Sequence, residues 1–167
     1  GNDVVALCCD GEDAEALQRA ELAFEEPGLE QKLKAQLDSG RLQITADENK
    51  AFHHSQVHFL ALASDQLEQG VALLSRLAAE ISSSITVVNQ STFPVGSAQR
   101  IKALMSEVQT DRFSTSDVHF LALPSFLQEG AAITNFTRPQ RILVGADDDW
   151  GLLLLTELLR PFNRNHD

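Results

Sequence analysis

Residues 88–100 read VNQSTFPVGSAQR, and they hold the transition that decides the fold. The strand-like segment 85–88 runs into a polar cluster at 89–92, and a helical pattern begins at Ser97. Ligands of open parallel sheets bind outside the carboxyl ends of the strands, and Gly96 would let a ligand approach the backbone at the next helix. The stretch therefore predicts a strand–loop–helix unit with a candidate ligand site in its loop. An ordinary connection in which Ser97 caps the helix is the alternative.

The same alternation of short apolar runs and amphipathic helices extends along the whole chain. It predicts an α/β fold with a mostly parallel sheet of about six strands and helices on both faces. The expected strands are residues 4–9, 42–45, 57–63, 85–88, 118–123 and 142–144. The expected helices are residues 12–22, a helix that starts at Pro27 and stops at Gly40, and residues 47–53, 66–81, 97–108 and 150–159.

The chain contains no low-complexity segment or linker, which predicts one domain over residues 1–162 followed by a polar tail at 163–167. Within that domain, SQVHFLALAS (55–64) and SDVHFLALPS (116–125) are nearly identical. The similarity does not continue beyond these segments. Two buried parallel strands drawn from the same few residue types therefore explain it better than an internal duplication.

The 167 residues carry a net charge of −11, with 43% hydrophobic and 22% charged residues, as in ordinary globular proteins. This charge, without clusters of Lys and Arg, excludes nucleic acid and an anionic membrane surface as partners. No apolar run reaches the ~20 residues of a membrane span, and no signal-peptide-like segment opens the sequence. A disulfide between the adjacent Cys8 and Cys9 would be strained, so we expect reduced thiols and a cytoplasmic protein.

Two polar clusters raise the question of a metal site. His54 and His58 are spaced i, i+4 and follow His53, but the segment passes from a helix end into a strand. They would not share a face, and no metal site is expected. Residues 147–149 are aspartates before an apolar helix, and carboxylates at a helix N-terminus explain them better than a cation site. The glutamates at 25–26 have the same explanation.

Four segments resemble signature motifs of the UDP-glucose/GDP-mannose dehydrogenase family, in the same order along the chain. EPGL (26–29) resembles its Glu-Pro-Gly-Leu/Asp segment, and STFPVGSAQRI (91–101) resembles its Ser-Thr-x-Pro-x-Gly-Thr signature. PSFLQEGAAI (124–133) resembles its Pro-Glu-Phe-Leu-x-Glu-Gly-x-Ala-Ile, and PQRILVG (139–145) its Pro-Asp-Arg-Ile-Val-Ile-Gly. The resemblance covers nearly the whole chain and implies the family's N-terminal, Rossmann-like nucleotide-binding domain. Family members oxidise the alcohol of a nucleotide-sugar to a carboxylate with two molecules of NAD.

The chain departs from the family at the cofactor site. No Gly-x-Gly-x-x-Gly occurs in the sequence, and residues 2–10 align with the family's second strand, so its first strand, Gly-rich turn and first helix have no counterpart. The family's ribose-binding acidic residue falls on Cys8, and Asp10, two residues later on the same face, is the one cofactor-binding candidate. The family's Gly-Thr-Pro reads Ala-Ser-Asp at 63–65, and the Lys before its Ser-Thr pair is Gln90. We therefore expect no bound cofactor, with NAD as the ligand if the family site persists.

The catalytic positions are changed as well. The family's catalytic Glu in Pro-Glu-Phe-Leu is Ser125, whose hydroxyl does not ionise near neutral pH to act as a base. The nucleophilic Cys of the family belongs to downstream domains that this sequence does not contain, and Cys8 and Cys9 lie on the wrong strand to replace it. No catalytic residue is therefore predicted. The remaining, vestigial ligand-site candidates are Ser91, Thr92, Gly96, Ser125 and Glu129, of which Thr92 and Glu129 keep the family's residues.

In the family's sheet the missing first strand is central, with the second and fourth strands on either side. Its loss would leave backbone groups unpaired, and two repairs are open. We favour a move of residues 4–9 to a place beside residues 57–63. The alternative is pairing from a second chain, and a homodimer is compatible with either.

The combined observations predict a non-catalytic binding or interaction module, with a nucleotide or nucleotide-sugar as the candidate ligand. The alternative is a fragment of an active NAD-dependent UDP-glucose/GDP-mannose dehydrogenase. The replacement of the family's Glu by Ser125 favours the first interpretation, because trimming a chain does not change an internal residue.

Overall fold

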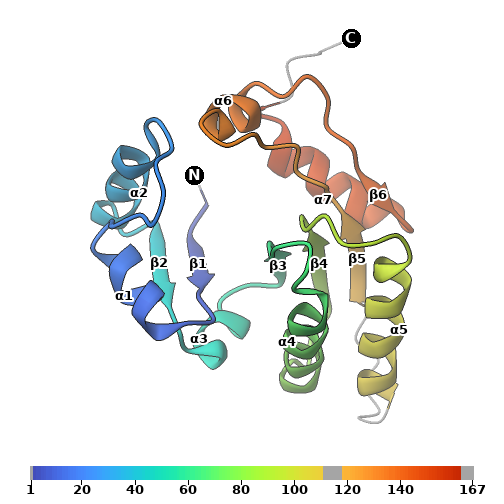
Figure 1. Ribbon diagram of the computed structural model, residues 1–167. Helices are drawn as coiled ribbons and strands as arrows, with labels where there is room; N and C mark the ends of the chain where they lie inside the picture. Colours follow the sequence, from blue (N-terminus) through green and yellow to red (C-terminus); the bar gives the residue numbers. More distant parts are fainter. Residues whose placement is uncertain (1, 111–117, 163–167) are drawn as a thin grey trace. The chain divides into compact units, whose positions relative to one another are not determined.

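The computed structural model describes residues 2–110 and 118–162, and the chain divides into two compact units (Figure 1). Unit 1 contains Gly1–His54 and Leu127–Pro139, and unit 2 contains Ser55–Phe126 and Gln140–Asp167. The single domain over residues 1–162 stays a prediction, and the predicted tail at 163–167 lies outside the described residues. None of the helices described within these ranges has the length and apolar character needed to cross a membrane.

Unit 1 is built around a two-stranded parallel sheet. Strand β1 (Val4–Leu7) pairs with β2 (Leu42–Thr45), and Val4 lies opposite Leu42. The helices of this unit are α1 (Gly11–Gln18), α2 (Leu29–Asp38), α3 (Glu48–Phe52) and α6 (Ala132–Thr137). Buried side chains on three of these elements, Ala14, Ile44 and Phe52, provide its apolar core.

Aspartates set the starts of two helices in unit 1. The Asp10 carboxylate accepts two backbone N–H groups of α1, at 2.7 and 3.3 Å, and the Asp47 carboxylate does the same for α3, at 3.0 and 3.3 Å. Helix α1 ends at Gln18 instead of residue 22, because Ala20 has a φ of 60°, outside the right-handed helical region. The sequence therefore predicted both helices, and α1 ends earlier than predicted because Ala20 has a left-handed conformation.

A buried carboxylate joins two loops of unit 1. Glu26 is only 8% exposed, and its Oε2 accepts the backbone N–H of Gly130 at 2.8 Å. Between Glu26 and α2, Gly28 has a φ of 81°, so the helix begins at Leu29 rather than at Pro27. The expectation that Glu26 merely flanks a helix N-terminus is wrong, because this carboxylate connects the EPGL segment to the loop before α6.

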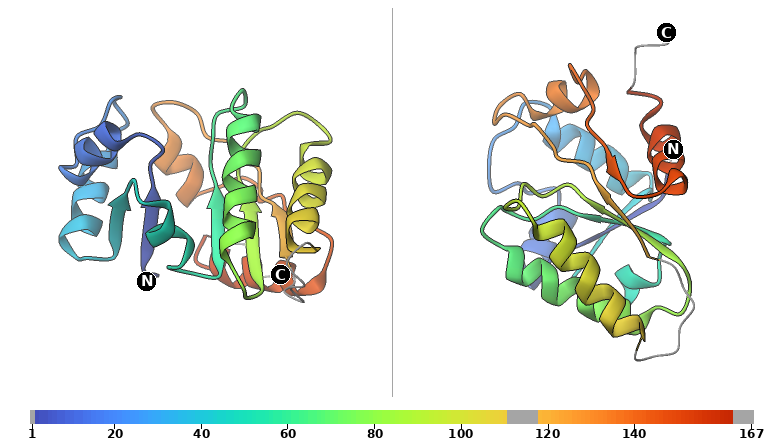
Figure 2. Two further views of the ribbon diagram at one scale, coloured as in Figure 1. Left: turned by 90° about the horizontal axis from the view of Figure 1, so that it is seen from below. Right: turned by 90° about the vertical axis from the view of Figure 1, so that its right-hand side faces the viewer.

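Unit 2 contains a four-stranded sheet in the order β3–β4–β5–β6. The strands are β3 (Val57–Leu60), β4 (Ile85–Asn89), β5 (Val118–Ala122) and β6 (Gly145–Ala146); the first three are parallel and β6 is antiparallel. Helices α4 (Leu67–Glu80) and α5 (Ser97–Thr110) lie together on one face, and α7 (Asp149–Leu159) lies on the other (Figure 2). Helices on both faces of a parallel-dominated sheet confirm the predicted α/β fold.

The last strand differs from the prediction. The strand expected at residues 142–144 is displaced to Gly145–Ala146, where it pairs with the end of β5. Ile142 and Val144 are partly buried instead, and they pack against a cluster formed by Val88, Leu121, Leu123 and Leu155. Their apolar character therefore reflects core packing and not a place in the sheet.

The two nearly identical segments flank β4 in different registers. His58 of β3 lies opposite Val87, whereas His119 of β5 lies opposite Thr86. Neighbouring residues of β4 point to opposite faces of the sheet, so this offset turns the two histidines to opposite faces. In the two nearly identical segments, the histidine of β3 therefore lies on the α4 side of the sheet, and the histidine of β5 lies on the α7 side.

The six strands are distributed over two sheets. Within unit 1, β1 forms a ladder with β2, and within unit 2, β3 forms one with β4. The expected pairing of residues 4–9 with residues 57–63 would join the two units, and it stays a prediction.

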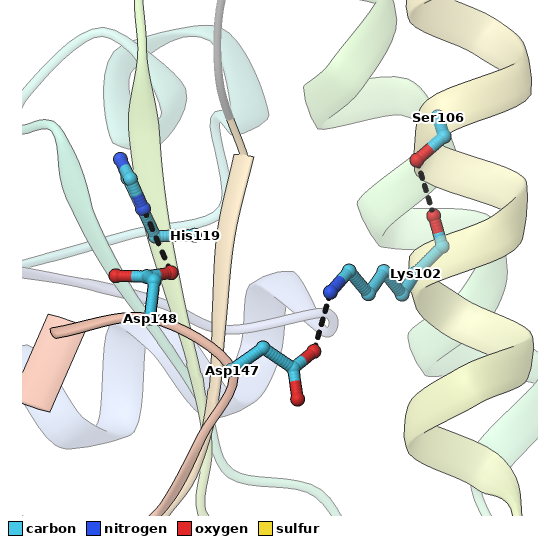
Figure 3. Close-up of polar contacts among 5 residues, drawn as sticks. All are labelled: Lys102, Ser106, His119, Asp147 and Asp148. Atoms are coloured by element: carbon cyan, nitrogen blue, oxygen red, sulfur yellow. Dashed lines mark hydrogen bonds and ion pairs between the residues drawn. The ribbon is translucent and has the colours of Figure 1, made fainter. Parts of the chain in front are cut away.

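Consecutive aspartates organise the start of α7 (Figure 3). Asp148 caps the helix: its Oδ1 accepts the N–H of Gly151 at 2.8 Å, and its Oδ2 lies 3.0 Å from Nδ1 of His119. Asp147 forms an ion pair with Lys102 of α5. The cap by Asp148, with Asp149 in the first turn of α7, confirms the helix N-terminus role for these two aspartates, where carboxylates meet the positive end of the helix dipole.

Replacing Asp148 by alanine should lower the free energy of unfolding by about 1 kcal/mol at neutral pH, because α7 loses its N-cap. The Gly151 N–H, followed by His119, holds the pKa of Asp148 below its ordinary value. Such a carboxyl stabilises the fold above its unfolded pKa of about 4, and this contribution is lost as the pH falls through the folded value. Urea unfolding followed through Trp150, the sole tryptophan, should show the difference shrinking in acid.

Asp148→Asn is the matched control, because asparagine caps helices about as well as aspartate and carries no charge. It should keep most of the stability at neutral pH and lose the part of the pH dependence that comes from this carboxyl. Equal unfolding free energies for the wild type and Asp148→Ala at neutral pH would contradict a stabilising cap.

Replacing Glu26 by alanine should cost about 2 kcal/mol of stability, because it removes a charged acceptor from the Gly130 N–H. Glu26→Gln keeps an acceptor oxygen and should cost less than the alanine variant. Amide hydrogen exchange at Gly130 measures this bond directly, and it should accelerate strongly in Glu26→Ala and only slightly in Glu26→Gln. An unchanged exchange rate in the alanine variant would show that the bond does not hold the two loops together.

Candidate functional site

The carboxyl ends of β4 and β5 carry the polar residues of the candidate site in unit 2. The N–H of Leu123 donates to the carbonyl of Asn89 at 2.8 Å, which extends the pairing of the two strands. Beyond it, the hydroxyl of Ser125 donates to the carbonyl of Gln90 at 3.4 Å. The structure thus places the STFPVG motif beside the start of the PSFLQEG motif.

Ser91 has a structural role at this end of the sheet. It is 7% exposed, its Oγ accepts the N–H of Leu62 at 2.8 Å, and its hydroxyl donates to the carbonyl of Leu60 at 3.4 Å. These bonds occupy the hydroxyl that the sequence offered to a ligand. Ser91 therefore joins the end of β3 to the end of β4.

Asn89 has a role that the sequence pattern did not predict. Its buried side chain closes the turn onto Ser91: Oδ1 accepts the N–H at 3.1 Å, and Nδ2 donates to the carbonyl at 3.4 Å. The signal was present in the Asn-x-Ser spacing, because Asn side chains at turns bond the backbone two residues further on. Most of the hydrogen-bonding groups in the polar cluster after β4 are thus paired with other groups of the protein.

Thr92 and Gly96 lie in the exposed part of this loop. Gly96 has a φ of 92°, which favours glycine, and its carbonyl accepts the N–H of Arg100 at 3.2 Å, the first helical bond of α5. Helix α5 therefore begins at Ser97, and the prediction that Ser97 caps it is wrong. The Ser97 hydroxyl instead donates to the carbonyl of Pro94 at 2.6 Å. Thr92 and Gly96 remain within reach of a ligand from solvent.

Ser125, at the position that the resemblance assigns to a catalytic Glu, offers only a neutral hydroxyl. A carboxylate base takes up a proton in the reaction, and a hydroxyl that already donates to Gln90 does not. Leu123, just before the proline, is buried and apolar. This end of the sheet can therefore supply hydrogen bonds to a ligand but no general base at position 125.

Asp10 and Glu129 belong to unit 1. The Asp10 carboxylate is engaged as the N-cap of α1, and Glu129 is exposed in the loop before α6. The candidates that unit 2 gathers at the carboxyl ends of its strands and in the following loop are Ser91, Thr92, Gly96 and Ser125.

The residues after β1 do not fit the pyrophosphate of a dinucleotide. A pyrophosphate binds at a helix N-terminus through free N–H groups and the positive end of the dipole. In α1 these N–H groups are bonded to Asp10, and Glu12 and Asp13 add negative charge to the first turn. Burial, with Asp13 and Cys9 adding to it, raises the pKa of the Cys8 thiol and keeps it neutral. The start of α1 therefore does not suit an anion, and the Asp10 carboxylate that caps it is not free to bind a ribose.

The three histidines of the candidate metal cluster have separate surroundings. Nδ1 of His53 lies 3.0 Å from the carbonyl of Asn49, and Nε2 of His54 lies 3.3 Å from the carbonyl of Asp3. Burial lowers the pKa of His58, whose Nε2 has no partner among the described residues. Across residues 2–110 and 118–162, no group of His, Cys, Asp and Glu side chains is arranged to hold a metal ion.

Comparison with known proteins identifies the family. The model of the UDP-glucose/GDP-mannose dehydrogenase family, NAD binding domain, matches residues 1–163. UDP-glucose 6-dehydrogenase of Pseudomonas aeruginosa is 35% identical over 174 residues, covering 100% of this chain and 38% of that protein. UDP-glucose 6-dehydrogenase of Rhizobium meliloti is 33% identical, covering 99% of this chain and 39% of that protein. The chain thus spans less than two fifths of the length of these relatives.

Solved structures show the same likeness. A UDP-glucose dehydrogenase from the archaeon Pyrobaculum islandicum has a TM-score of 0.84 at 25% identity, covering 98% of this chain and 39% of that chain. A GDP-mannose dehydrogenase from Pseudomonas aeruginosa has a TM-score of 0.86 at 24% identity, covering 96% of this chain and 39% of that chain, and it supports the fold alone. The match over residues 1–163 shows that the chain belongs to the UDP-glucose/GDP-mannose dehydrogenase family, as its NAD binding domain.

Proposed function

We propose that this chain is a non-catalytic domain of the nucleotide-sugar dehydrogenase type, acting as a binding or interaction module. The observation that carries the proposal is Ser125, which takes the place of the catalytic Glu that the resemblance implies. Its hydroxyl donates to the carbonyl of Gln90 at 3.4 Å and supplies no carboxylate base. An alcohol oxidation that needs such a base would not proceed on this chain.

NAD is expected to bind very weakly or not at all. The sequence holds no Gly-x-Gly-x-x-Gly, and the Asp10 carboxylate occupies the N-terminus of α1 after the strand that would receive the ribose. The Asp10 carboxylate is therefore engaged by backbone N–H groups and is not free to bind a ribose. Both observations support weak binding of NAD by these 167 residues.

A nucleotide or nucleotide-sugar is the candidate ligand for the site that remains. Thr92 and Gly96 are exposed in the loop that leads into α5, where a hydroxyl and backbone N–H groups suit phosphate and sugar oxygens. The net charge of −11 opposes nucleic acid and an anionic membrane surface as partners. We also propose a cytoplasmic location and a homodimer. The location is inferred from the two adjacent cysteines, which we expect to be reduced.

A second candidate is a fragment of an active NAD-dependent nucleotide-sugar dehydrogenase. It is favoured by length, because the chain spans 38% of the Pseudomonas aeruginosa UDP-glucose 6-dehydrogenase. The reading frame of the encoding gene separates the two candidates. A start codon next to Asn2 and a stop codon after Asp167 would exclude the interpretation as a fragment. A reading frame that continues into a catalytic half would support that interpretation.

Calorimetric titration of the 167-residue chain with NAD, and separately with UDP-glucose, tests the proposal. We expect no saturable NAD binding tighter than about 1 mM, which corresponds to about 4 kcal/mol of binding free energy. The physical reasons are the absence of a Gly-x-Gly-x-x-Gly turn from the sequence and the engagement of Asp10 as the N-cap of α1. Binding of UDP-glucose alone would leave a non-catalytic sugar-nucleotide site.

The Pseudomonas aeruginosa UDP-glucose 6-dehydrogenase serves as the positive control for UDP-glucose in the same buffer. Saturable NAD binding in the micromolar range would refute the proposed loss of cofactor, and it would assign Asp10, Thr92 and the nearby backbone to a rebuilt site. No detectable binding of NAD or of UDP-glucose would direct the search to protein partners.

A further inference from the structure

The EPGL segment forms a tight turn within unit 1. The N–H of Leu29 donates to the carbonyl of Glu26 at 3.0 Å, which closes a turn of four residues. Proline in the second position, and in the third a glycine with a φ of 81° and a ψ of 0°, identify a type II turn. A Cβ atom on Gly28 would lie 3.8 Å from Cδ1 of Ile133. The EPGL turn therefore lies beside α6.

The residues just before α6 form a second tight turn in the same unit. In this 128–131 turn, the N–H of Ala131 donates to the carbonyl of Gln128 at 3.1 Å. Gly130, in the third position, has a φ of 76°, which favours glycine. The second position of the turn is therefore occupied by Glu129.

Two side chains from outside hold the 128–131 turn in place. Asn135 of α6 accepts the first N–H of the turn at 2.9 Å through its Oδ1. The Glu26 carboxylate accepts the N–H of Gly130 at 2.8 Å, from the other turn. The backbone N–H groups before and after Glu129 are thus both bonded to fixed side chains, which restricts the conformations open to this residue.

The carboxylate of Glu26 is buried to make this bond. Glu26 is only 8% exposed, and its side chain forms no ion pair in the described part of unit 1. A glutamine would accept the same N–H without burying a charge. A charged acceptor, however, makes a shorter and stronger hydrogen bond than a neutral one. The residue at position 26 therefore gives a firm hold on the turn at the cost of burying a carboxylate.

The 128–131 turn leaves one carboxylate without a structural role. Within the described part of unit 1, no hydrogen bond or ion pair involves the Glu129 side chain. Carboxylate oxygens accept hydrogen bonds from hydroxyl groups, and a side chain on a fixed backbone binds without the cost of ordering a loop. Glu129 is therefore suited to accept hydroxyl groups of a sugar.

We propose that Glu26 is a positioning residue. It fixes the 128–131 turn through the N–H of Gly130, so that the Glu129 carboxylate accepts hydroxyl groups of the sugar in a nucleotide-sugar ligand. The proposal rests on the ligand class proposed above, and it adds a residue that acts without touching the ligand. If the two turns served only to stabilise unit 1, no effect of Glu26 on binding would pass through Glu129.

Calorimetric titration of the 167-residue chain with UDP-glucose tests this coupling. Glu129→Gln should weaken binding about tenfold, because a hydroxyl group loses a charged acceptor. Glu26→Ala should weaken binding about fivefold or more, because the turn is released. The double variant should bind no more weakly than Glu129→Gln alone, since Glu26 acts through Glu129. Effects of the two changes that multiply in the double variant would overturn the proposal.

Glu25→Ala is the matched control, because it removes the neighbouring, exposed negative charge and leaves the N–H of Gly130 bonded. It should bind like the wild type, and Glu26→Gln, which keeps an acceptor, should bind within about threefold of it. Gly130→Ala disturbs the same turn through its positive φ, since the added Cβ would have no atom within 4 Å. It should weaken binding as Glu26→Ala does. Circular dichroism checks each fold, and Gly130→Ala provides the test if Glu26→Ala does not fold.

The NMR order parameter of the Glu129 amide tests the positioning without a ligand. It should be about 0.85 in the wild type and below about 0.6 in Glu26→Ala. Equal order parameters in the two proteins would overturn the proposal. UDP-glucose binding that neither Glu26→Ala nor Glu129→Gln weakens would also overturn it and leave the proposed ligand. No binding by the wild type, with a Glu129 that loses its order in Glu26→Ala, would instead exclude this ligand and support the hold of Glu26 on the turn.

Discussion

All five residues of β4 are buried, so every backbone N–H and C=O group of this strand must find a partner inside the protein. β3 and β5 supply these partners in parallel on its two sides. The helices follow from the two apolar faces of this triplet, with α4 and α5 on one face and α7 on the other. Where β4 ends, the Asn89 and Ser91 side chains continue to satisfy buried backbone groups. The candidate site is thus a continuation of the hydrogen-bond network of the core.

Elements with a long apolar period or a clear stop signal were predictable from the sequence. The structure places β2 at Leu42–Thr45 as predicted, and α4, at Leu67–Glu80, differs from its prediction by one residue at each end. Helix α6 was not predicted because its six residues, AITNFT, show no apolar period. Strand β6 has two residues and exists through its pairing with β5. Such short elements depend on tertiary contacts that a local pattern does not contain.

For the site, the sequence predicted where polar residues gather but not what each one does. Ser91 was a ligand candidate because it follows a buried strand, yet its hydroxyl bonds the chain after β3, which lies far away in the sequence. Asp10 was a cofactor candidate because it shares a strand face with Cys8, but β1 ends at Leu7 and the carboxylate caps the next helix. The burial of Glu26 depends on Gly130, 104 residues further along the chain. Such roles come from long-range contacts, and a single sequence does not display them.

The argument for a lost reaction comes from two side chains and the backbone groups that hold them. Ser125 stands where the resemblance implies a carboxylate base, and its hydroxyl donates to the carbonyl of Gln90. Asp10, the cofactor-binding candidate after β1, accepts two backbone N–H groups at the start of α1. Both side chains therefore complete the backbone hydrogen bonds of their own unit. A polar residue that the backbone engages in this way contributes to stability, and it is less available to a ligand.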